Sequence, residues 1–439
     1  MAEETIRKKS VALLYDRSKC IGCSRCVRRC EKIGINHLSI EGIGKNANII
    51  FREDNPCVLC GQCSLVCPVK SMVEQDDLTV VDNLLKNKNG KIVIVQCAPS
   101  IRTSINETRK AEHSISVEKK LNGALKKVGF DKVFDVNFGA DITTYAESEE
   151  LIERLEKNEN LPMFTSCCPS WVLYVEEKKP FLKKHLTSAF SPHIHSGIAY
   201  KTWWAEKNNV NPESIVVVSI MPCVSKKHEA SLEKTKIRGM RAVDYVLTTR
   251  ELGQLFGMRD IKFEEEEEFG GDELAEHSGA GTIYGASGGV MESALRAAYR
   301  LLTKNNLENI ELTAVRCGFE GMKEAEIDVN GRTVKVAIVA SPINFEKFID
   351  SGEYKKYHYI EMMNCLGGCI NGGGQPLLPA KAELEESLIE KRRNVLYSLD
   401  RDKKKRNALD NEILKEYIRW AETKEDKRRL FHIHGGENE

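Results

Sequence analysis

Two closely spaced runs of cysteine constrain this chain more than any other feature. Both have the spacing C-x2-C-x2-C-x3-C, within CIGCSRCVRRC and CVLCGQCSLVCP. They supply eight thiols, namely Cys20, Cys23, Cys26, Cys30, Cys57, Cys60, Cys63 and Cys67. Three thiols on one tight loop can surround one face of an iron–sulfur cubane, which has four iron corners to ligate. A zinc-ribbon-like site is the weaker alternative, because eight thiolates exceed what one or two structural zinc ions need.

The spacing is that of a bacterial-type ferredoxin with two [4Fe–4S] clusters, in which the fourth cysteine of each run serves the other cluster. One cluster is then expected on Cys20, Cys23, Cys26 and Cys67, and the other on Cys57, Cys60, Cys63 and Cys30. Pro68 follows the second run as usual, whereas Glu31 follows the first. A module of this kind passes electrons between a docked partner and a buried site.

Composition narrows the class of protein further. The 439 residues carry 65 basic and 65 acidic side chains, so charge gives no reason to expect nucleic acid or a membrane surface as partner. The opening MAEETIRKKS lacks the apolar core of a secretory signal, and no apolar run reaches the roughly 18 residues of a membrane span. We therefore expect a soluble cytoplasmic protein. That compartment keeps thiols reduced, so its spaced cysteines are expected to bind metal rather than form disulfides.

Beyond residue 90 the pattern is one of alternating strands and helices. KIVIVQCAP, SIVVVSIMPC and KVAIVAS predict buried strands, whereas ESEELIERLEK and GGVMESALRAAYRLL have the apolar spacing of helices. This alternation indicates α/β layers with largely parallel strands, where ligands bind beyond the carboxyl ends of strands. Cys223 and Cys365 fall at such ends, which predicts that they converge. GAGTIYGASGG does not complete a dinucleotide fingerprint, because Tyr284 stands where the third glycine is needed.

Three further motifs carry a family resemblance. TSCCPSW, MPCVSKKHE and EMMNCLGGCINGGGQP, in this order and behind two ferredoxin runs, resemble the three signatures of the [FeFe]-hydrogenase family. The resemblance extends from the first cysteine run to the terminal LFHIH. It implies an H-cluster, which is a [4Fe–4S] cubane joined through one cysteine to a two-iron unit with CO, cyanide and dithiolate ligands. The cubane ligands that it implies are Cys168, Cys223, Cys365 and Cys369, with Cys369 as the bridge.

Cys167 is an extra thiol beside an implied ligand. Adjacent side chains point in different directions, so Cys167 and Cys168 are not expected to do the same job. A free thiol has a pKa of about 8.5, close enough to neutrality to pass a proton each way. The resemblance implies that Cys167 exchanges protons with the two-iron unit, along a route through Glu147, Thr187 and Glu150. The alternatives are an inert buried thiol and, for the two glutamates, a solvated helical edge.

Other residues are implied to surround the cofactor. Lys226 matches the family's lysine that donates to a cyanide ligand, and the alternative is one more surface lysine. The remaining implied contacts are Ala98, Pro99, Ser100, His193, Met221 and Met363. His193 stands where the family usually has glutamine, and it either tunes cyanide hydrogen bonding, titrates near neutral pH or only packs. Ser170, Tyr284 and Leu366 are further departures, which alter the surroundings of the cofactor and leave its ligands in place. Cys97 and Cys317 are expected to be buried packing.

The expected fold is α/β: an H-cluster domain of two α/β lobes with mostly parallel sheets, behind a small α+β bacterial-type ferredoxin domain. We expect the ferredoxin-like domain at residues 1–86, the H-cluster domain at 87–380 and a C-terminal helical segment packed on it at 381–439. The expected function is that of an iron hydrogenase, 2H⁺ + 2e⁻ ⇌ H2. Ferredoxin or another small electron carrier is the expected partner, and maturation proteins insert the two-iron unit. The alternatives are a hydrogen or redox sensor of the same family with slow turnover and, less favoured, a non-enzymatic iron–sulfur assembly protein.

Overall fold

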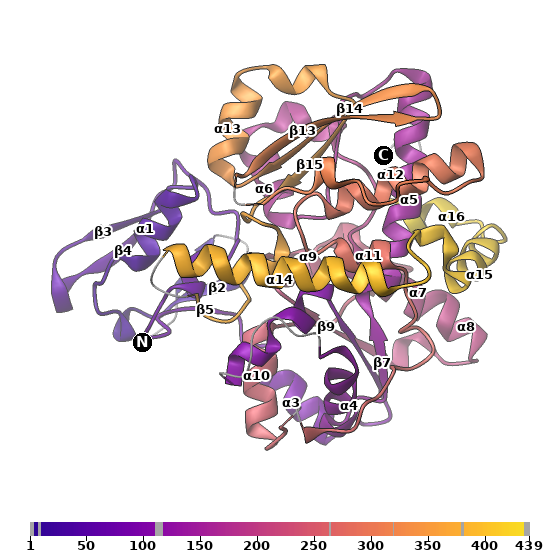
Figure 1. Ribbon diagram of the computed structural model, residues 1–439. Coiled ribbons are helices and arrows are strands. Elements are labelled where there is room, and N and C mark those ends of the chain that lie inside the picture. Colours follow the sequence, from indigo (N-terminus) through magenta and orange to yellow (C-terminus); the bar gives the residue numbers. More distant parts are fainter. Residues whose placement is uncertain are drawn as a thin grey trace.

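The two cysteine runs lie in a small α+β unit at the amino terminus (Figure 1). The computed structural model describes residues 4–7, 10–109, 117–262, 265–318, 320–378 and 382–433. In the amino-terminal unit, β2 pairs antiparallel with β1 and β5, and β3 and β4 form an antiparallel hairpin. The bounds are β1 Glu4–Arg7, β2 Ser10–Tyr15, α1 Arg25–Lys32, β3 Leu38–Glu41, β4 Asn48–Phe51, α2 Gln62–Leu65 and β5 Met72–Glu74. This is the α+β ferredoxin-like arrangement that the cysteine spacing predicted.

The first lobe of the larger part is built on a four-stranded sheet of order β12-β9-β6-β7, in which every pair is parallel. The strands are β6 Ile92–Cys97, β7 Lys132–Asp135, β9 Ile215–Met221 and β12 Tyr245–Thr248. The two central strands, β6 and β9, are almost fully buried. Burial on both faces explains why their sequences are continuous apolar runs without alternation. The helices nearest in sequence are α3 Leu78–Lys86, α4 Glu118–Val128, α9 Ser225–Ser231 and α10 Thr249–Met258.

The second lobe is a mixed sheet of order β13-β14-β15-β8. β13 and β14 form an antiparallel hairpin, whereas β14, β15 and β8 run parallel. Along β14, Val336 and Ile338 pack in one apolar cluster with α5 and α12, while Ala337 and Val339 pack in another with α6 and α13. This two-residue alternation places helices on both faces of the sheet. The bounds are β8 Met163–Phe164, α6 Pro169–Lys178, α12 Gly289–Thr303, β13 Met322–Val329, β14 Arg332–Ala340, α13 Pro342–Asp350 and β15 Tyr359–Met363.

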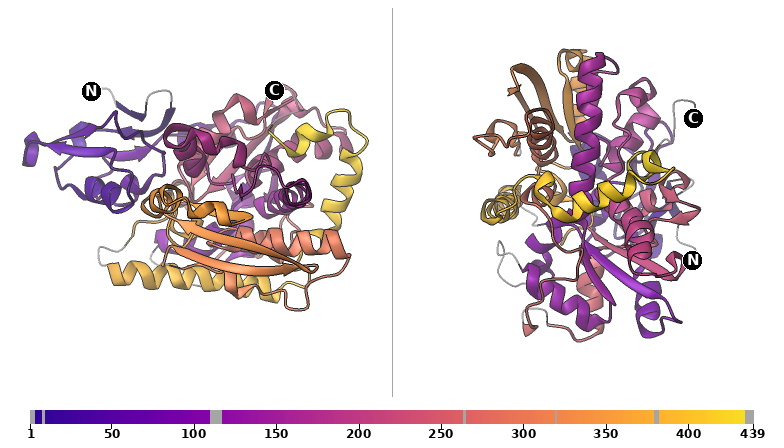
Figure 2. Two further views of the ribbon diagram at one scale, coloured as in Figure 1. Left: turned by 90° about the horizontal axis from the view of Figure 1, so that it is seen from above. Right: turned by 90° about the vertical axis from the view of Figure 1, so that its right-hand side faces the viewer.

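Helix α5, Val136–Lys157, lies between the lobes (Figure 2). It contacts α7 Pro192–Ala199, α11 Gly279–Ile283 and α12. The Asp135 carboxylate caps it by accepting a hydrogen bond from the backbone N–H of Asn137 at 2.8 Å. Sequence periodicity predicted only its second half, because residues 136–148 are buried on every side and show no amphipathic spacing.

The carboxyl-terminal segment wraps the larger part with three helices, α14 Ala382–Asp402, α15 Glu412–Ala421 and α16 Lys427–Phe431. Helix α14 starts near the amino-terminal unit and crosses the molecule along both lobes (Figures 1 and 2). The buried Arg296 of α12 holds its far end through two hydrogen bonds of 2.9 Å to Asp400. Although α5 and α14 are long, no helix in the described ranges combines the length and apolarity needed to cross a bilayer.

The last residues that the sequence assigned to the ferredoxin-like domain, 78–86, form helix α3. Its Leu78, Val81 and Leu85 belong to the same apolar cluster as strands β6 and β7. We therefore propose that the amino-terminal unit ends ahead of Leu78, and that α3 belongs to the first lobe.

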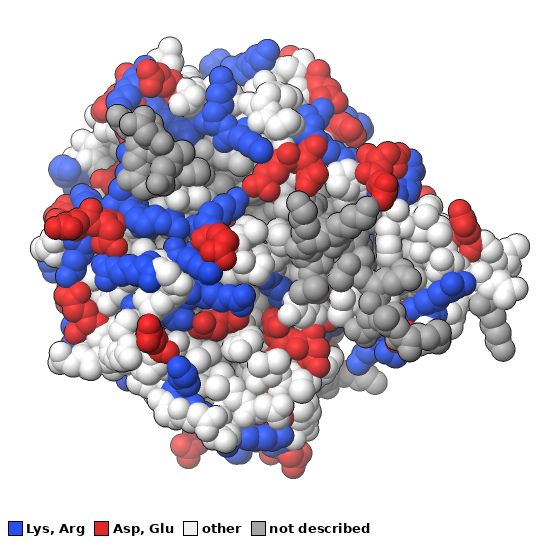
Figure 3. Space-filling model, turned by 180° about the vertical axis from the view of Figure 1, so that it is seen from behind, with Lys and Arg blue, Asp and Glu red and all other residues white. Residues whose placement is uncertain are grey.

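The surface charge is unevenly distributed although the net charge is zero. On the face opposite to that of Figure 1, basic side chains gather on the part away from the amino-terminal unit, with acidic ones among them (Figure 3).

Candidate active site

Strands from both lobes end at one buried cavity. Ala98, Pro99 and Ser100 follow β6, Cys223 follows β9 and Met363 ends β15. Ten residues of the sequence prediction line the cavity: Ala98, Pro99, Ser100, Cys167, Cys168, Met221, Cys223, Lys226, Met363 and Cys369. The structure thus brings together four segments that lie far apart in the sequence, at residues 98–100, 167–168, 221–226 and 363–369.

The four predicted cubane thiols come from three separate turns. Cys168 precedes α6, Cys223 lies between β9 and α9, and Cys365 and Cys369 follow β15. Burial raises the pKa of Cys365 to about 12, and the Cys168 and Cys369 thiols contribute to this rise. Burial likewise raises the pKa of Cys223, with Cys365 and Cys168 as neighbours. The four sulfur atoms are therefore close enough to influence one another's ionisation.

This donor set fits a cubane. Buried thiols resist ionisation on their own, and the positive charge of bound iron overcomes that resistance because a metal-bound thiol is deprotonated. Ser100 adds a second sign of fit, since its buried hydroxyl has no hydrogen-bond partner among the described residues. Such an orphaned donor beside the thiols suits an anionic ligand on a metal.

Cys167 also opens on the cavity, yet its surroundings differ from those of Cys168. Burial raises the pKa of Cys167, its next largest influence is the Glu147 carboxyl, and the Lys226 ammonium opposes both. The Lys226 Nζ atom donates to the backbone carbonyl of Cys167 at 3.0 Å. Cys167 is thus a neutral thiol that lines the cavity and lies within electrostatic reach of a buried carboxyl group.

Lys226 is held by a buried three-residue network. Its Nζ atom donates to Glu229 Oε2 at 2.7 Å, and the His193 Nε2–H donates to the same oxygen at 2.6 Å. Burial favours the neutral form of Glu229, but Lys226 and His193 outweigh it and lower the pKa of Glu229 to about 2. Lys226 is 6% exposed, so the alternative of a surface lysine is excluded.

His193 lies behind this network and does not line the cavity. Burial lowers its pKa, so its imidazole is neutral near pH 7. With Nε2 donating to Glu229, Nδ1 is a bare acceptor, and it has no partner among the described residues. A contact between His193 and the cofactor therefore stays a prediction.

Glu147 is 1% exposed, which excludes the solvated-edge alternative for this residue. Neither of its carboxyl oxygens has a hydrogen-bond partner in good geometry within the described residues, although the Tyr359 hydroxyl lies near enough to favour the carboxylate. Burial raises the pKa of Glu147 to about 8, the Tyr359 hydroxyl offsets part of that rise, and Glu150 and Glu361 add to it. Glu147 is accordingly a protonated carboxyl at neutral pH, with a proton available to donate.

Glu150 is the centre of a hydrogen-bond network toward the surface. Its Oε2 atom accepts from the Thr187 hydroxyl at 2.7 Å and from the Ser188 hydroxyl at 3.0 Å. Arg154 pairs with the other oxygen at 2.5 Å, and Ser188 Oγ lies 2.9 Å from His432 Nδ1. The structure thus joins Thr187 to Glu150, as the proposed route requires.

Ser188 and His432 were missed by the sequence reasoning. They are 244 positions apart, and no local pattern links them. A surface cavity of about 410 Å³ is lined in part by Arg154, Thr187, Ser188 and Glu229, so solvent reaches the outer end of this network.

The amino-terminal thiols form two groups. The thiols that raise the pKa of Cys26, after burial, are Cys67, Cys20 and Cys23. Those that act on Cys63 are Cys57 and Cys30, together with Cys26 of the first group, so the two groups are neighbours. Cys20 and Cys23 are partly exposed while the other six are buried, and Cys60 lies within electrostatic reach of Cys365. The two groups therefore span the distance from the surface to the cavity.

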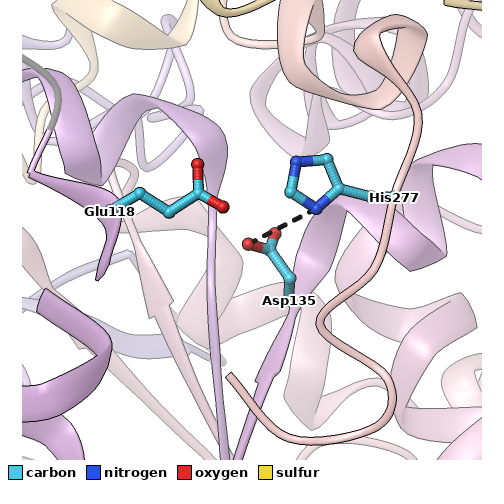
Figure 4. Close-up of side chains that lie close together, drawn as sticks. All are labelled: Glu118, Asp135 and His277. Carbon is cyan, nitrogen blue, oxygen red and sulfur yellow. Dashed lines mark ion pairs between the residues drawn. The ribbon is translucent and has the colours of Figure 1, made fainter. Parts of the chain in front are cut away.

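A separate cluster of metal-binding side chains lies in the first lobe, at Glu118, Asp135 and His277 (Figure 4). The Arg102 guanidinium contacts both carboxylates, at 2.9 Å from Glu118 and 2.6 Å from Asp135. Arg102 is 2% exposed, so a buried cation already balances these charges. We assign no metal to this cluster.

Comparisons with known proteins agree with this geometry. Residues 91–373 match the family described as "Iron only hydrogenase large subunit, C-terminal domain", and residues 19–71 match "4Fe-4S dicluster domain". Iron hydrogenase 1 of Clostridium pasteurianum is 42% identical over 422 residues, which cover 94% of this chain and 73% of that protein. The periplasmic [Fe] hydrogenase large subunit of Nitratidesulfovibrio vulgaris is 38% identical, with coverage of 84% and 87%.

Structural comparison gives the same result. A solved structure described under oxygen inactivation of [FeFe]-hydrogenase superposes with a TM-score of 0.70 at 32% identity, and covers 82% of this chain and 99% of that one. A more distant relative, cytosolic iron-sulfur assembly component 3 of Rattus norvegicus, is 28% identical over 86% of this chain and 82% of its own length.

The predicted cofactors, two [4Fe–4S] clusters and an H-cluster, are confirmed by the dicluster and hydrogenase domains. The chain is an iron hydrogenase and belongs to the iron-only, or [FeFe], hydrogenase family.

Proposed function

We propose that the chain catalyses the reversible reaction 2H⁺ + 2e⁻ ⇌ H2. The observation that carries this proposal is the position of Cys167. Its thiol opens on the cavity shared by Cys168, Cys223 and Cys369, and it lies within electrostatic reach of a protonated buried carboxyl, Glu147. When bound, the H-cluster supplies the metal centre at which protons and electrons combine.

Four thiols would hold the cubane in this proposal, namely Cys168, Cys223, Cys365 and Cys369, and Cys369 would also hold the two-iron unit. Lys226 donates to an anionic ligand of that unit, and its charge is kept by Glu229. An ammonium about 4 Å from a unit negative charge contributes on the order of 4 kcal/mol at an effective dielectric of 20. Ser100 offers a second donor, while Ala98, Pro99, Met221 and Met363 supply an apolar wall that keeps water out.

The proposed proton route runs through Cys167, Glu147, Thr187 and Glu150. Cys167 and Glu147 both hold their protons at neutral pH because burial raises their pKa values. Thr187 donates to Glu150, and Thr187 itself lines the surface cavity. Two neutral donors on the inside and a carboxylate on the outside let a proton move without a buried charge persisting.

Electrons are proposed to enter at the cluster of the partly exposed Cys20 and Cys23, from ferredoxin or another small carrier. The thiols that would hold the second cluster, Cys57, Cys60, Cys63 and Cys30, would lie between that entry point and the cubane site, because Cys60 is within electrostatic reach of Cys365. Separate maturation proteins are expected to supply the two-iron unit. The cytoplasmic location stays a prediction from the sequence.

Two other functions remain as alternatives. A sensor would bind the same cofactor and turn over slowly, and the departures at His193, Ser170, Tyr284 and Leu366 favour it. An assembly protein would need neither the Cys167 thiol nor the buried Lys226 ammonium, so these residues count against it.

The deciding experiment loads the full chain with the two-iron unit and measures H2 production from a reduced dye. Fast production supports the enzyme. Infrared bands of iron-bound CO and cyanide with very slow turnover support the sensor, and absence of those bands after loading supports the assembly protein.

A further inference from the structure

Gln62 joins the ferredoxin-like unit to the proposed cubane site. It begins helix α2, between Cys60 and Cys63, and is 2% exposed. Its Nε2 atom donates to the backbone carbonyl of Asn371 at 2.8 Å and lies 3.5 Å from the Cys365 sulfur, within the range of an N–H···S hydrogen bond. The side chain from one cluster-binding loop thus touches a ligand of the next cluster.

The orientation of the Gln62 amide is fixed by Arg29. The Arg29 Nε and Nη2 atoms donate to Gln62 Oε1 at 2.9 and 2.6 Å. A guanidinium has donors and no acceptor, so the atom that faces it must be the amide oxygen. A flipped amide would set N–H groups against Arg29 and its oxygen against the Asn371 carbonyl. The N–H groups of Gln62 are therefore directed toward Asn371 and Cys365.

Arg29 is itself held by helix α14. Its Nη1 atom donates to both carboxylate oxygens of Glu385, at 3.0 and 3.2 Å, and both side chains are more than 90% buried. A charge pair at this depth has a large penalty for losing either partner. The carboxyl-terminal helix thereby keeps Arg29, and through it the Gln62 amide, in place.

The two modules meet without space for adjustment at this point. A Cβ atom on Gly373 would lie 2.1 Å from the Cys60 carbonyl oxygen, and one on Gly61 would lie 2.6 Å from Val224 Cγ2. Close backbone contact of this kind requires glycine. It holds Gln62 at a fixed distance from Cys365.

We propose that Gln62 tunes the reduction potential of the H-cluster cubane by donating a hydrogen bond to the Cys365 sulfur. This inference rests on the proposed ligand role of Cys365. A hydrogen bond to a ligating sulfur stabilises the more negative, reduced cluster and so raises its potential. The Arg29–Glu385 pair acts as a positioning device that keeps the donor aimed at the sulfur. A higher cubane potential favours electron flow inward from the ferredoxin-like clusters.

The test is a redox titration, followed by electron paramagnetic resonance, of the full chain with its [4Fe–4S] clusters reconstituted and the two-iron unit left out. We compare wild type with Gln62→Leu and the isosteric Gln62→Glu, which turns the donor into an acceptor. At a fixed ambient potential the ratio of reduced to oxidised cubane should fall roughly tenfold in both variants, equivalent to about 59 mV for one electron. The ferredoxin-like clusters should titrate as in wild type.

Two further variants test whether the shift is specific to Gln62 and whether the Arg29–Glu385 pair positions its amide. Ser64 is a buried polar residue in the same helix, and its side chain forms hydrogen bonds with Gly61 and Arg250 rather than with Cys365. In Ser64→Ala the cubane potential should therefore stay at the wild-type value. The double variant Arg29→Met with Glu385→Met removes the positioning pair without leaving a lone charge, and should shift the potential in the same direction by a smaller amount.

The outcomes are distinct. An unchanged or raised cubane potential in Gln62→Leu and Gln62→Glu would overturn the proposal. Gln62→Glu keeps the shape of the side chain, so the comparison holds even where Gln62→Leu does not assemble its clusters. Retention of the complete cubane signal in Cys365→Ala would instead overturn the ligand assignment, and with it the basis of the inference.

Discussion

Replacement of Glu147 by glutamine tests the inner part of the proton route. The carboxyl is 1% exposed, and burial raises its pKa from 4.5 to about 8. Glutamine has the same shape but cannot release and recover a proton. Removal of a positioned acid or base typically lowers rates about 10²- to 10⁴-fold, so we expect H2 evolution to fall by that factor.

The same pKa predicts an opposite effect on stability. In the unfolded chain the carboxyl ionises near pH 4.5, whereas the folded chain keeps it protonated up to about pH 8. At 1.36 kcal/mol per pH unit, this costs about 3 kcal/mol at pH 7. The sign follows from the raised folded pKa. Below pH 4.5 the carboxyl is protonated in both the folded and the unfolded chain, so it does not change the stability. As the pH rises from 4.5 through 8, the unfolded chain loses its proton first and stability is lost. Glutamine removes that dependence, although its buried amide adds a pH-independent cost of about 1–3 kcal/mol.

The diagnostic quantity is therefore the change with pH of the difference in stability between wild type and Glu147→Gln. Thermal-unfolding midpoints of wild type and Glu147→Gln should move apart in favour of the variant between pH 5 and pH 8. Infrared spectra of wild type should show a protonated-carboxyl band that disappears as the pH rises through about 8. The variant should lack this band at every pH. Glu153→Gln is the matched control, because Glu153 lies on the same helix, exposed and paired with Lys157 at 2.6 Å. A constant difference in midpoint across this range, or full activity of Glu147→Gln, would refute the reasoning.

Three more substitutions test neighbouring positions. Cys167→Ala should keep the CO and cyanide infrared bands of the loaded protein while H2 evolution falls by about 10² or more, and normal turnover would contradict the role of Cys167. Lys226→Met leaves the Glu229 carboxylate buried with only a neutral imidazole, at a cost of about 3–5 kcal/mol, and should reduce retention of the two-iron unit. Full band intensity in that variant would argue against Lys226, and the half-exposed Lys234→Met is its control. Thr187→Val removes the hydroxyl that donates to Glu150 and should slow turnover about 10²-fold, while Thr187→Ser retains the rate. Equal rates for valine and serine would remove Thr187 from the route.

Local sequence signals predicted the parts of the fold whose physics is local. β6 and β9 were predicted because a strand covered on both faces is apolar along most of its length. The cysteine runs predicted the cluster-binding loops because a cubane needs closely spaced thiolates. Helix α3 was not predicted, because its Asp and Lys residues are typical of a polar linker. Its Leu78, Val81 and Leu85 become core residues only through contact with the apolar cluster of β6 and β7, which the local sequence does not reveal.

Contacts between distant segments account for what the sequence could not reveal. The Arg29–Glu385 pair spans 356 positions, and each residue alone looks like a surface charge on a polar helix. Only folding shows that both are buried, because burial depends on what other segments place above them.

His193 shows how the two kinds of information combine. Its sequence position predicted a role near the cofactor, but left open whether the ring binds, titrates or packs. In the structure the ring donates to Glu229, and Glu229 in turn accepts from Lys226. Because burial lowers the pKa of His193, the imidazole stays neutral and leaves the negative charge of Glu229 fully available to the ammonium. An amide at this position could also donate to Glu229, so the histidine conserves the hydrogen bond that holds Lys226 while changing the shape behind it. We therefore predict that the departure from the family pattern acts on the cofactor through Lys226, by way of two hydrogen bonds rather than direct contact.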